Sequence, residues 1–361
     1  MEVAILGTKG VPGHSGVEVV VDSLIPHLVS LGHRVTVFGH DSYTSPNKNY
    51  QGASIKTIRG VSNKNLEMLS HMMGASLDTR RHEYDIVHIH NADPCLLAWI
   101  PKAQKGIIAT SHGQAYLRDK WNVPAKLLSR IAERFFIRIP NHITSVSLPL
   151  SVFYQKKYHR QVKYIPNGII LRNSPAPNLL EKWQLQPRSF LFCSAGRIER
   201  TKGIHTLISA HKKLKSRLPL IIAGGGKGTD ETYFHDLKEN APAGVYFVGF
   251  LTGDELFALY AHAKVFIFPS EYEAMSMAFL EGLSFGTPTV YSNIPENIAV
   301  AADIGYPFEV ADADSLSNSI DSVVYNYDTA LDKGRKAASH VKKYHDWVSI
   351  AAQYSDLYEK L

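Results

Sequence analysis

Two carboxylates eight positions apart, Glu273 and Glu281, stand in an otherwise apolar segment, 269–282. A carboxylate that faces a core must find a hydrogen-bonding partner, either in the protein or on the hydroxyls of a ligand. The spacing predicts Glu273 at a strand-to-helix turn and Glu281 two turns along the helix, on nearly the same face. A solvated helix face is a poor explanation of Glu281, because few other polar residues accompany it.

A loop between a predicted strand and a predicted helix carries two cations, Arg197 and Lys202, between Gly196 and Gly203. A guanidinium can bind a diphosphate through two hydrogen bonds, and an ammonium can bind it as a point charge. A solvated charged loop would have the same composition, so the loop alone leaves both interpretations open.

Two glycine-rich loops follow other predicted strands. The first, 7–16, opens a helix, so its N–H groups could face an anion, although its spacing is not the G-x-G-x-x-G of a dinucleotide site. The second, 223–228, includes Gly225 and permits close approach of a ligand to the backbone. A plain connection or a flexible turn explains either loop equally well.

No metal site is predicted. His88, His90 and His112 are assigned to different strands and have no accompanying cysteine or histidine cluster. Asp312 and Asp314 resemble a metal-binding pair, but they precede a surface helix, which favours a structural role. We therefore expect no metal cofactor.

Two alternating series of strands and helices position these residues. The alternation runs from residue 3 to about 164 and resumes at 189, which predicts an α/β protein with two doubly wound parallel sheets. The predicted domains are 1–170 and 171–340, and the amphipathic segment 341–361 follows as a helix. Two such domains leave a cleft at the carboxyl ends of their strands, where these sheets bind ligands.

Composition narrows the class of protein. The chain has 361 residues, 45% of them hydrophobic and 20% charged, which excludes a disordered, collagenous or disulfide-knot protein. Its two cysteines, Cys95 and Cys193, are far apart and indicate neither zinc nor a disulfide framework. No signal peptide and no stretch of about 18 apolar residues is found, so we expect a cytoplasmic protein with at most peripheral membrane contact.

The charge is concentrated in the first half. Residues 1–174 hold 21 Lys and Arg against 11 Asp and Glu, whereas residues 175–361 hold 18 against 22. Within the stretch 116–138, basic residues alternate with apolar ones, which is typical of a helix on an anionic membrane but equally of an ordinary helix with a solvated basic face. Its basic residues are Arg118, Lys120, Lys126, Arg130, Arg134 and Arg138.

Taken together, these features resemble glycosyltransferase family 4, whose members are retaining enzymes of the GT-B fold, here of the bacterial cell-surface polysaccharide type. The most specific part is Glu273-x7-Glu281 followed by Gly286-Thr287-Pro288, with the Arg197 and Lys202 loop about seventy residues earlier. The resemblance spans essentially the whole chain. Supporting motifs are Gly32-His33-Arg34-Val35, Ser111-His112-Gly113, Ile165-Pro166-Asn167-Gly168 and Trp347.

The resemblance implies a role for individual residues. Arg197 and Lys202 would neutralise the donor diphosphate, Glu281 would accept hydrogen bonds from the nucleotide ribose, Glu273 would lie against the donor sugar, and His112 would approach that sugar from the first domain. The resemblance also implies that the segment 341–361 crosses back to the first domain. Further donor-binding residues implied in this way are Ser15, Gly16, Gly196, Gly225, Ala274, Met275 and Ser276.

The sequence departs from the family pattern at three places. Ser15 replaces the first glycine of a Gly-Gly turn, Ala274-Met275-Ser276 stands where many members have Gly-Phe-Gly, and Gly282 stands where alanine is usual. The second departure leaves the identity of the donor sugar open.

The implied reaction moves a sugar from a nucleotide-diphosphate donor to a hydroxyl of a saccharide or lipid-linked saccharide, with retention and without a metal. The alternatives are a nucleotide-sugar epimerase of the same architecture, an NAD-dependent oxidoreductase and a non-catalytic sugar-nucleotide-binding protein. The oxidoreductase predicts a G-x-G-x-x-G turn that this chain lacks. We expect neither nucleic-acid binding nor a cofactor.

Overall fold

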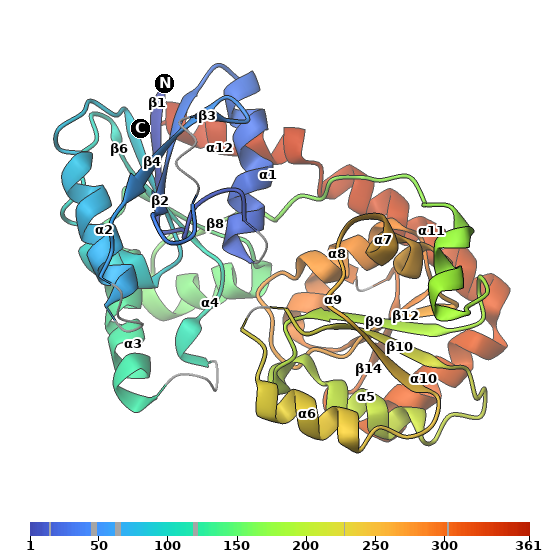
Figure 1. The fold of residues 1–361 in the computed structure, drawn as a ribbon. Coiled ribbons are helices and arrows are strands. Elements are labelled where there is room, and N and C mark those ends of the chain that lie inside the picture. The colour runs from blue at the N-terminus through green and yellow to red at the C-terminus, as the bar shows by residue number, and fades with distance from the viewer. Residues whose placement is uncertain (14–15, 45–48, 62–65, 118–121, 227, 302) are drawn as a thin grey trace. The chain divides into compact units, whose positions relative to one another are not determined.

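The structure is a computed structural model that describes residues 1–13, 16–44, 49–61, 66–117, 122–226, 228–301 and 303–361. The chain forms two compact units (Figure 1). Residues 1–168 together with 345–361 form the first unit, and residues 169–344 form the second. The second unit extends past residue 340 because its last helix, α11 (Tyr327–Tyr344), continues to Tyr344.

The first unit contains a mainly parallel sheet. Within the described residues its strand order is β3-β4-β2-β1-β5-β6-β7-β8, and only the pairing of β3 with β4 is antiparallel. The strands are β1 (Glu2–Leu6), β2 (Arg34–His40), β3 (Asn49–Tyr50), β4 (Ala53–Ile58), β5 (Ile86–His90), β6 (Gly106–Ser111), β7 (His142–Ser145) and β8 (Lys163–Tyr164).

Alternate residues of the central strand β5 serve opposite faces of this sheet, as the period of a strand requires. Val87 and Ile89 join the core that α2, α3 and α4 cover, whereas the His88 ring contacts Tyr354 and Tyr358 of α12 on the other face. The helices are α1 (Val17–Ser30), α2 (Glu67–Asp78), η1 (Asp93–Leu97), η2 (Ala115–Leu117), α3 (Val123–Arg138), α4 (Leu148–Tyr158) and α12 (Trp347–Glu359).

The second unit contains a parallel sheet with the order β11-β10-β9-β12-β13-β14 within the described residues. These two parallel-sheet units confirm the predicted α/β class. The strands are β9 (Leu191–Gly196), β10 (Leu220–Gly224), β11 (Val245–Gly249), β12 (Val265–Phe268), β13 (Thr289–Ser292) and β14 (Tyr306–Phe308).

Helices cover both faces of this second sheet (Figure 1). Phe192 and Phe266 pack with α7, α8 and α11, whereas Leu191 and Cys193 pack with α5, α6 and α10. The helices are η3 (Pro177–Trp183), η4 (Arg200–Lys202), α5 (Ile204–His211), α6 (Glu231–Glu239), α7 (Gly253–His262), α8 (Met277–Ser284), α9 (Pro295–Ala301), α10 (Ala313–Tyr325) and α11.

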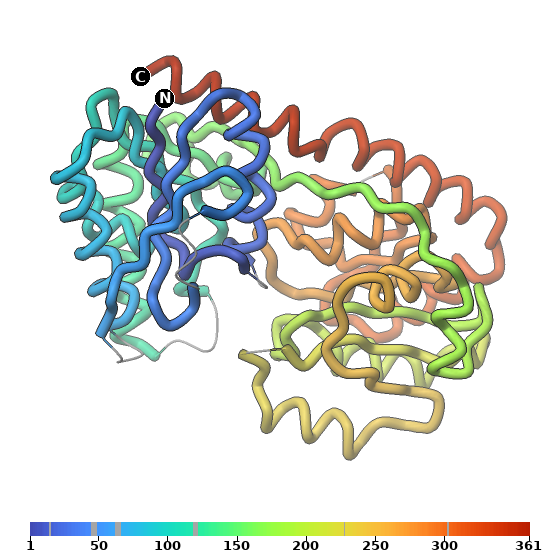
Figure 2. The backbone as a smooth tube through the Cα atoms, turned by 45° about the horizontal axis from the view of Figure 1, so that its top comes forward, coloured from blue at the N-terminus to red at the C-terminus, as the bar shows by residue number. Residues whose placement is uncertain are grey.

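The C-terminal helix α12 belongs to the first unit although it follows the second in sequence. The tube trace in Figure 2 shows the last residues, in red, returning to the N-terminal strands. Hydrogen bonds attach α12 there, among them those of His33 Nε2 with Ser355 Oγ and of His88 Nδ1 with Tyr358 Oη, both 2.8 Å. The first unit is therefore built from two segments that lie far apart in the sequence.

Two local expectations were wrong. The stretch 116–138 is not one helix, because α3 starts only at Val123, where Asn122 accepts a hydrogen bond from the Ala125 N–H as the N-cap. The helix that carries Glu281 starts at Met277, so Glu273 lies in the turn between β12 and this helix, as predicted, but it does not share a helical face with Glu281.

Other expectations about local structure are confirmed. Cys95 and Cys193 are both buried and unpaired. Asp312 has a structural role, since its side chain accepts hydrogen bonds from the N–H groups of Asp314 and Ser315 as the N-cap of α10. No helix among the described residues has both the length and the apolar character that crossing a membrane requires.

Candidate active site

The loop that carries Arg197 and Lys202 follows β9, at the carboxyl edge of the second sheet. Gly203 ends it with φ 66°, and a side chain at that position would meet the carbonyl oxygen of Pro269 at 2.1 Å. The N–H of Glu271 donates to the carbonyl of Thr201 (2.8 Å). Glycine at 203 therefore allows the loops after β9 and β12 to lie against each other.

This contact brings two predicted site residues together. Lys202 Nζ donates to Glu273 Oε1 at 2.6 Å, and the two side chains are 16% and 12% exposed. The pair joins residues 71 positions apart in sequence, and the sequence indicated no direct bond between them. The ammonium and the carboxylate therefore neutralise each other as long as no ligand competes for either group.

Arg197 is the more accessible cation. Its guanidinium is 4.0 Å from the Glu199 carboxylate, and 30% of its side chain is exposed. A side chain at Gly228 would meet Arg197 Cδ at 3.2 Å, so the glycine-rich loop lies against the arm of this arginine. The guanidinium is thus held at the carboxyl ends of β9 and β10 with part of its surface free.

The glycine-rich loop after β10 uses its N–H groups internally. The N–H groups of Gly225 and Gly226 donate to the Gly196 carbonyl at 3.0 and 2.9 Å. Gly225 has φ 108°, and a side chain at Gly226 would meet the Phe250 ring at 2.7 Å. The backbone conformation and the close neighbours of these residues therefore explain why they are glycines. The assignment of Gly196 and Gly225 to donor binding stays a prediction.

Glu281 lies in α8 with part of its side chain exposed. Burial raises the pKa of its carboxyl to about 7, while the Tyr260 hydroxyl and the positive charge of Arg172 lower it. The sequence analysis predicted that this carboxylate has a polar partner. Tyr260 and Arg172 of the second unit are such partners. The raised pKa shows that these two groups do not fully stabilise the ionised carboxylate. Hydrogen bonds from ligand hydroxyls could stabilise it further.

The segment between the two carboxylates forms the loop into α8. Ala274 and Met275 precede the helix, and Met275 packs partly buried against the core beneath α8. Ser276 is the N-cap, but its hydroxyl accepts no capping hydrogen bond. This hydroxyl and the N-terminus of α8 therefore lie on the same loop as Glu273.

Glu296 is a further acidic residue that the sequence did not indicate. It lies in the first turn of α9, where burial and the nearby negative charge of Glu273 raise its pKa. The Lys202 and Glu273 pair thus has a third charged neighbour. This neighbour could be found only in the structure, because α9 and the loop after β12 are separate in sequence and come close in space.

The predicted residues of the first unit lie at the carboxyl edge of its sheet. His112 directly follows β6, and Gly16 is the N-cap of α1 with φ 55° and open space where a side chain would be. A side chain at Gly7 would meet the carbonyl oxygen of His90 at 2.2 Å, so the loop after β1 lies against the end of β5. Ser15 lies outside the described residues.

The three histidines considered as metal ligands form a buried group of another kind. His88 and His90 share β5, which corrects their assignment to different strands, and His90 Nδ1 is 2.9 Å from His112 Nε2. His88 contacts Thr110 Oγ1 through Nε2 at 2.7 Å. Burial lowers the pKa of His112 and His88 to about 3, and that of His90 well below its usual value. All three rings are therefore neutral at neutral pH.

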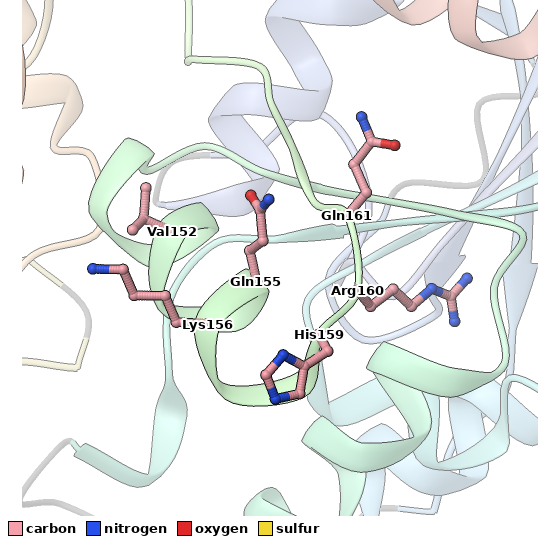
Figure 3. Close-up of a pocket in the computed structure, with 6 residues that line it drawn as sticks. All are labelled: Val152, Gln155, Lys156, His159, Arg160 and Gln161. Atoms are coloured by element: carbon pink, nitrogen blue, oxygen red, sulfur yellow. The ribbon is translucent and has the colours of Figure 1, made fainter.

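A separate pocket lies in the first unit at the end of α4 (Figure 3). Its cavity is about 540 Å³, and its lining includes none of the predicted site residues. The guanidinium of Arg160 donates to the carbonyls of Ile137, Pro140 and Asn141, and so binds the C-terminal end of α3. The lining residues are Val152, Gln155, Lys156, His159, Arg160 and Gln161.

Comparisons with known proteins identify the fold and the family of this chain. Residues 14–173 match Glycosyltransferase Family 4, and residues 176–340 match Glycosyl transferases group 1. The chain is similar in structure to sucrose-phosphate synthase from Thermosynechococcus elongatus, with a TM-score of 0.83 and 20% identity over 100% of this chain and 98% of the other. It is also similar to Anabaena HepE in complex with UDP-glucose, with a TM-score of 0.82 and 16% identity over 100% of both chains.

Three curated relatives are more similar in sequence. An uncharacterized glycosyltransferase of Bacillus subtilis is 27% identical over 83% of both chains. The UDP-Gal:alpha-D-GlcNAc-diphosphoundecaprenol alpha-1,3-galactosyltransferase of Escherichia coli is 26% identical over 67% of this chain and 66% of its own. O-antigen chain mannosyltransferase B of Escherichia coli is 31% identical over 44% of this chain and 41% of its own. The chain belongs to glycosyltransferase family 4 and has the GT-B fold.

Proposed function

We propose that this protein transfers a sugar from a nucleotide-diphosphate donor to a hydroxyl of a saccharide or lipid-linked saccharide, with retention, in cell-surface polysaccharide biosynthesis. The observation that carries the proposal is the pairing of Lys202 with Glu273 where the loops after β9 and β12 meet, with Arg197 in the first of these loops and Glu281 in the helix that follows the second. The names of the Escherichia coli relatives support the saccharide class of acceptor.

In the proposed reaction the bond between the anomeric carbon and the diphosphate oxygen breaks, and negative charge develops on the departing oxygen. Arg197 and Lys202 stabilise this charge, and they do so most strongly in the transition state, when the charge is largest. The bond of Lys202 to Glu273, at 2.6 Å, already positions the ammonium group. The diphosphate therefore binds a cation that is held in place before the donor arrives. These two cations supply the positive charge that a metal would otherwise supply.

We propose that the acceptor oxygen attacks on the face that the diphosphate leaves, and that the acceptor proton passes to the departing phosphate. This sequence gives retention without a covalent intermediate on the protein. Glu281 accepts hydrogen bonds from the nucleotide ribose, and Glu273 lies against the donor sugar. Ala274, Met275 and Ser276 line the donor from the loop before α8.

The test is acceptor-dependent transfer in the presence of EDTA. Purified protein is incubated with UDP-, GDP- and dTDP-sugars and with GlcNAc-diphosphoundecaprenol, and the released nucleotide and the anomeric configuration of the product are measured. The proposal predicts nucleoside diphosphate release that requires acceptor, with the donor's anomeric configuration in the product. Interconversion of donor sugars without acceptor would indicate the epimerase instead, and an inverted product would refute retention.

We propose further that the surface of α3 and α4 contacts an anionic membrane at its inner face. Arg130, Arg134 and Arg138 are exposed along α3, as their spacing predicted. Large apolar side chains are exposed beside them, and α4 adds others. Basic and apolar groups on one surface match the charge of anionic headgroups and the acyl boundary below them. The exposed apolar residues of these helices are Val123, Leu127, Leu128, Ile131, Leu148, Val152 and Phe153.

Vesicle co-sedimentation tests the membrane contact. Binding should be stronger to phosphatidylglycerol vesicles than to phosphatidylcholine vesicles, and the substitution Leu127→Ser should weaken it severalfold, because Leu127 is 58% exposed. Tyr325→Ser on α10, where the tyrosine is 89% exposed in the second unit, is the matched control. Equal binding to both kinds of vesicle would refute the contact.

A further inference from the structure

His112 is held by one neighbour in the first unit. Its Nε2 is 2.9 Å from His90 Nδ1, and the two rings stack with centroids 5.2 Å apart. The ring makes no other hydrogen bond among the described residues, so Nδ1 is the nitrogen left for a ligand. His112 keeps part of its surface exposed, whereas His90 is completely buried.

Between two neutral imidazoles only one of the facing nitrogens carries a proton. If His112 donates, then His90 Nδ1 accepts and the His90 proton is on Nε2. If His90 donates, then His90 Nε2 is a bare lone pair and the His112 proton is on Nδ1. The tautomer of one ring therefore fixes that of the other.

The far nitrogen of His90 decides between these arrangements. His90 Nε2 is buried and has no hydrogen-bond partner among the described residues. Buried N–H groups without a partner are rarer in protein interiors than buried acceptors whose hydrogen-bonding capacity is incompletely used. The arrangement with a bare lone pair at this position is thus favoured, and His90 Nδ1–H donates to His112.

We propose that His90 is a positioning residue that holds His112 as the neutral tautomer with its proton on Nδ1. His112 then presents an N–H that donates to an oxygen of the bound sugar or diphosphate. It does not serve as the base that removes the acceptor proton. This inference rests on the proposed function for the identity of the ligand, but the tautomer itself is independent of it.

The neighbouring groups hold His90 in turn. Its ring lies 4.2 Å, centroid to centroid, from that of His88, which is bonded to Tyr358 of α12 and to Thr110 of β6. Thr110 Oγ1 also lies 2.6 Å from Thr144 Oγ1 of β7. The orientation of His112 thus depends on a buried polar group that spans three strands and the C-terminal helix.

The experiment is a long-range proton–nitrogen NMR correlation of protein labelled with ¹⁵N-histidine, with the His112 signals assigned by their loss in His112→Asn. The expected result is a protonated Nδ1 and an unprotonated Nε2 in His112. The opposite assignment would overturn the proposal. This readout needs no substrate, so it stands even if no transfer of sugar is found.

Two variants test whether His90 is the cause. His90→Leu removes the donor, so we expect a mixture of His112 tautomers. We also expect kcat to fall about tenfold, which corresponds to the loss of one hydrogen bond, with little change in the KM for the donor. His90→Asn places an amide N–H near the position of Nδ1 and should restore both the tautomer and kcat. His112 with its proton on Nδ1 alone in His90→Leu would overturn the role of His90.

His71→Leu is the matched control. It also removes a buried imidazole from the first unit, but this ring lies against that of His40, with the centroids 5.7 Å apart, and is not part of the group of side chains around His90. The tautomer of His112 and kcat should be unchanged in it. If His90→Leu does not fold, the wild-type spectrum and His90→Asn still decide the proposal.

Discussion

Arg197 is the residue on which the proposed chemistry depends most. Its side chain is 30% exposed and its nearest carboxylate is 4.0 Å away, so the fold gains little from it. Arg197→Ala should lower kcat by about a hundredfold, the usual effect of losing one charged group that stabilises a leaving oxygen. The melting temperature should stay nearly constant.

The neighbouring Arg200 provides the control for this substitution. It lies in the same loop, is exposed, and stacks over the Tyr233 ring at 5.4 Å. Steady-state kinetics of Arg200→Ala should resemble those of the wild type. Full activity in Arg197→Ala would remove this residue from the diphosphate site.

Glu281 predicts a dependence of stability on pH. Burial raises its pKa from the ordinary 4.5 to about 7, so the folded protein binds a proton more tightly than the unfolded chain. The wild type therefore loses stability relative to Glu281→Gln as the pH rises from about 4.5 to 7, by on the order of 3 kcal/mol in total. Thermal unfolding of both proteins at pH 5 and pH 8 measures this difference. A difference that does not change with pH would contradict the cause given for the raised pKa.

At the scale of elements, Glu133 joins α3 and α4 to the segment after His112. Its carboxylate is 2% exposed and accepts hydrogen bonds from Gln114, Tyr116, Lys157 and Tyr158 at 2.5–3.0 Å. Burial by itself raises the pKa of this carboxyl, but these four donors outweigh burial and lower it. The proposed membrane surface and the His112 segment are thus tied through one buried carboxylate.

Glu133→Gln should lower the free energy of unfolding by about 2 kcal/mol at pH 7, since a buried acceptor oxygen and a charge are lost. Because the folded pKa is below the ordinary 4.5, this contribution is present above pH 4.5 and disappears as the pH falls through the lowered pKa. Urea denaturation at pH 7 and pH 4 measures it. Glu255→Gln, in the exposed pair with Lys182, should change stability by less than about 0.5 kcal/mol and serves as the control.

The strands that carry the site were predicted because their apolar runs are nearly continuous, as in β9 and β12. The edge strand β8 and the charged strand β4 were not, since Lys163 and Lys56 interrupt any apolar pattern. Arg197, Lys202 and Glu281 could be selected from the sequence because cations in a glycine-bounded loop and an acid in an apolar helix are unusual. The contacts of Glu296 and the bond between Lys202 and Glu273 could not, because they arise where separate loops meet.

One signal in the sequence was overlooked. His88 and His90 are two positions apart in a buried strand, and this spacing puts both on the same face. The partners on that face come from β6 and α12, and no local pattern indicates which helix covers it. The orienting contact of His90 with His112 therefore required the structure.

At the scale of the whole molecule, the chain passes from one unit to the other twice, near residues 168 and 345. Within the first unit these two segments touch: His345 Nδ1 lies 2.8 Å from the Asn167 carbonyl oxygen, and a side chain at Gly168 would meet the Trp347 ring at 2.4 Å. Both connections between the units therefore begin beside one contact within the first unit.

Trp347→Ala should destabilise the first unit by about 3–5 kcal/mol, because Trp347 is 2% exposed and its loss leaves a cavity beside Gly168. Val348→Ala is the adjacent control, since Val348 is 59% exposed on the same helix. Differential scanning calorimetry of the two variants measures the difference. Equal melting temperatures would show that α12 contributes little to the first unit.

The central claim is that the second unit binds a nucleoside diphosphate through Arg197, Lys202 and Glu281. Calorimetric titration with UDP, GDP, dTDP and NAD, each with EDTA, tests it most directly. The account predicts that at least one nucleoside diphosphate binds to the wild type and that Arg197→Ala weakens this binding at least tenfold. Binding of NAD alone, or of none of the three nucleoside diphosphates, would contradict it.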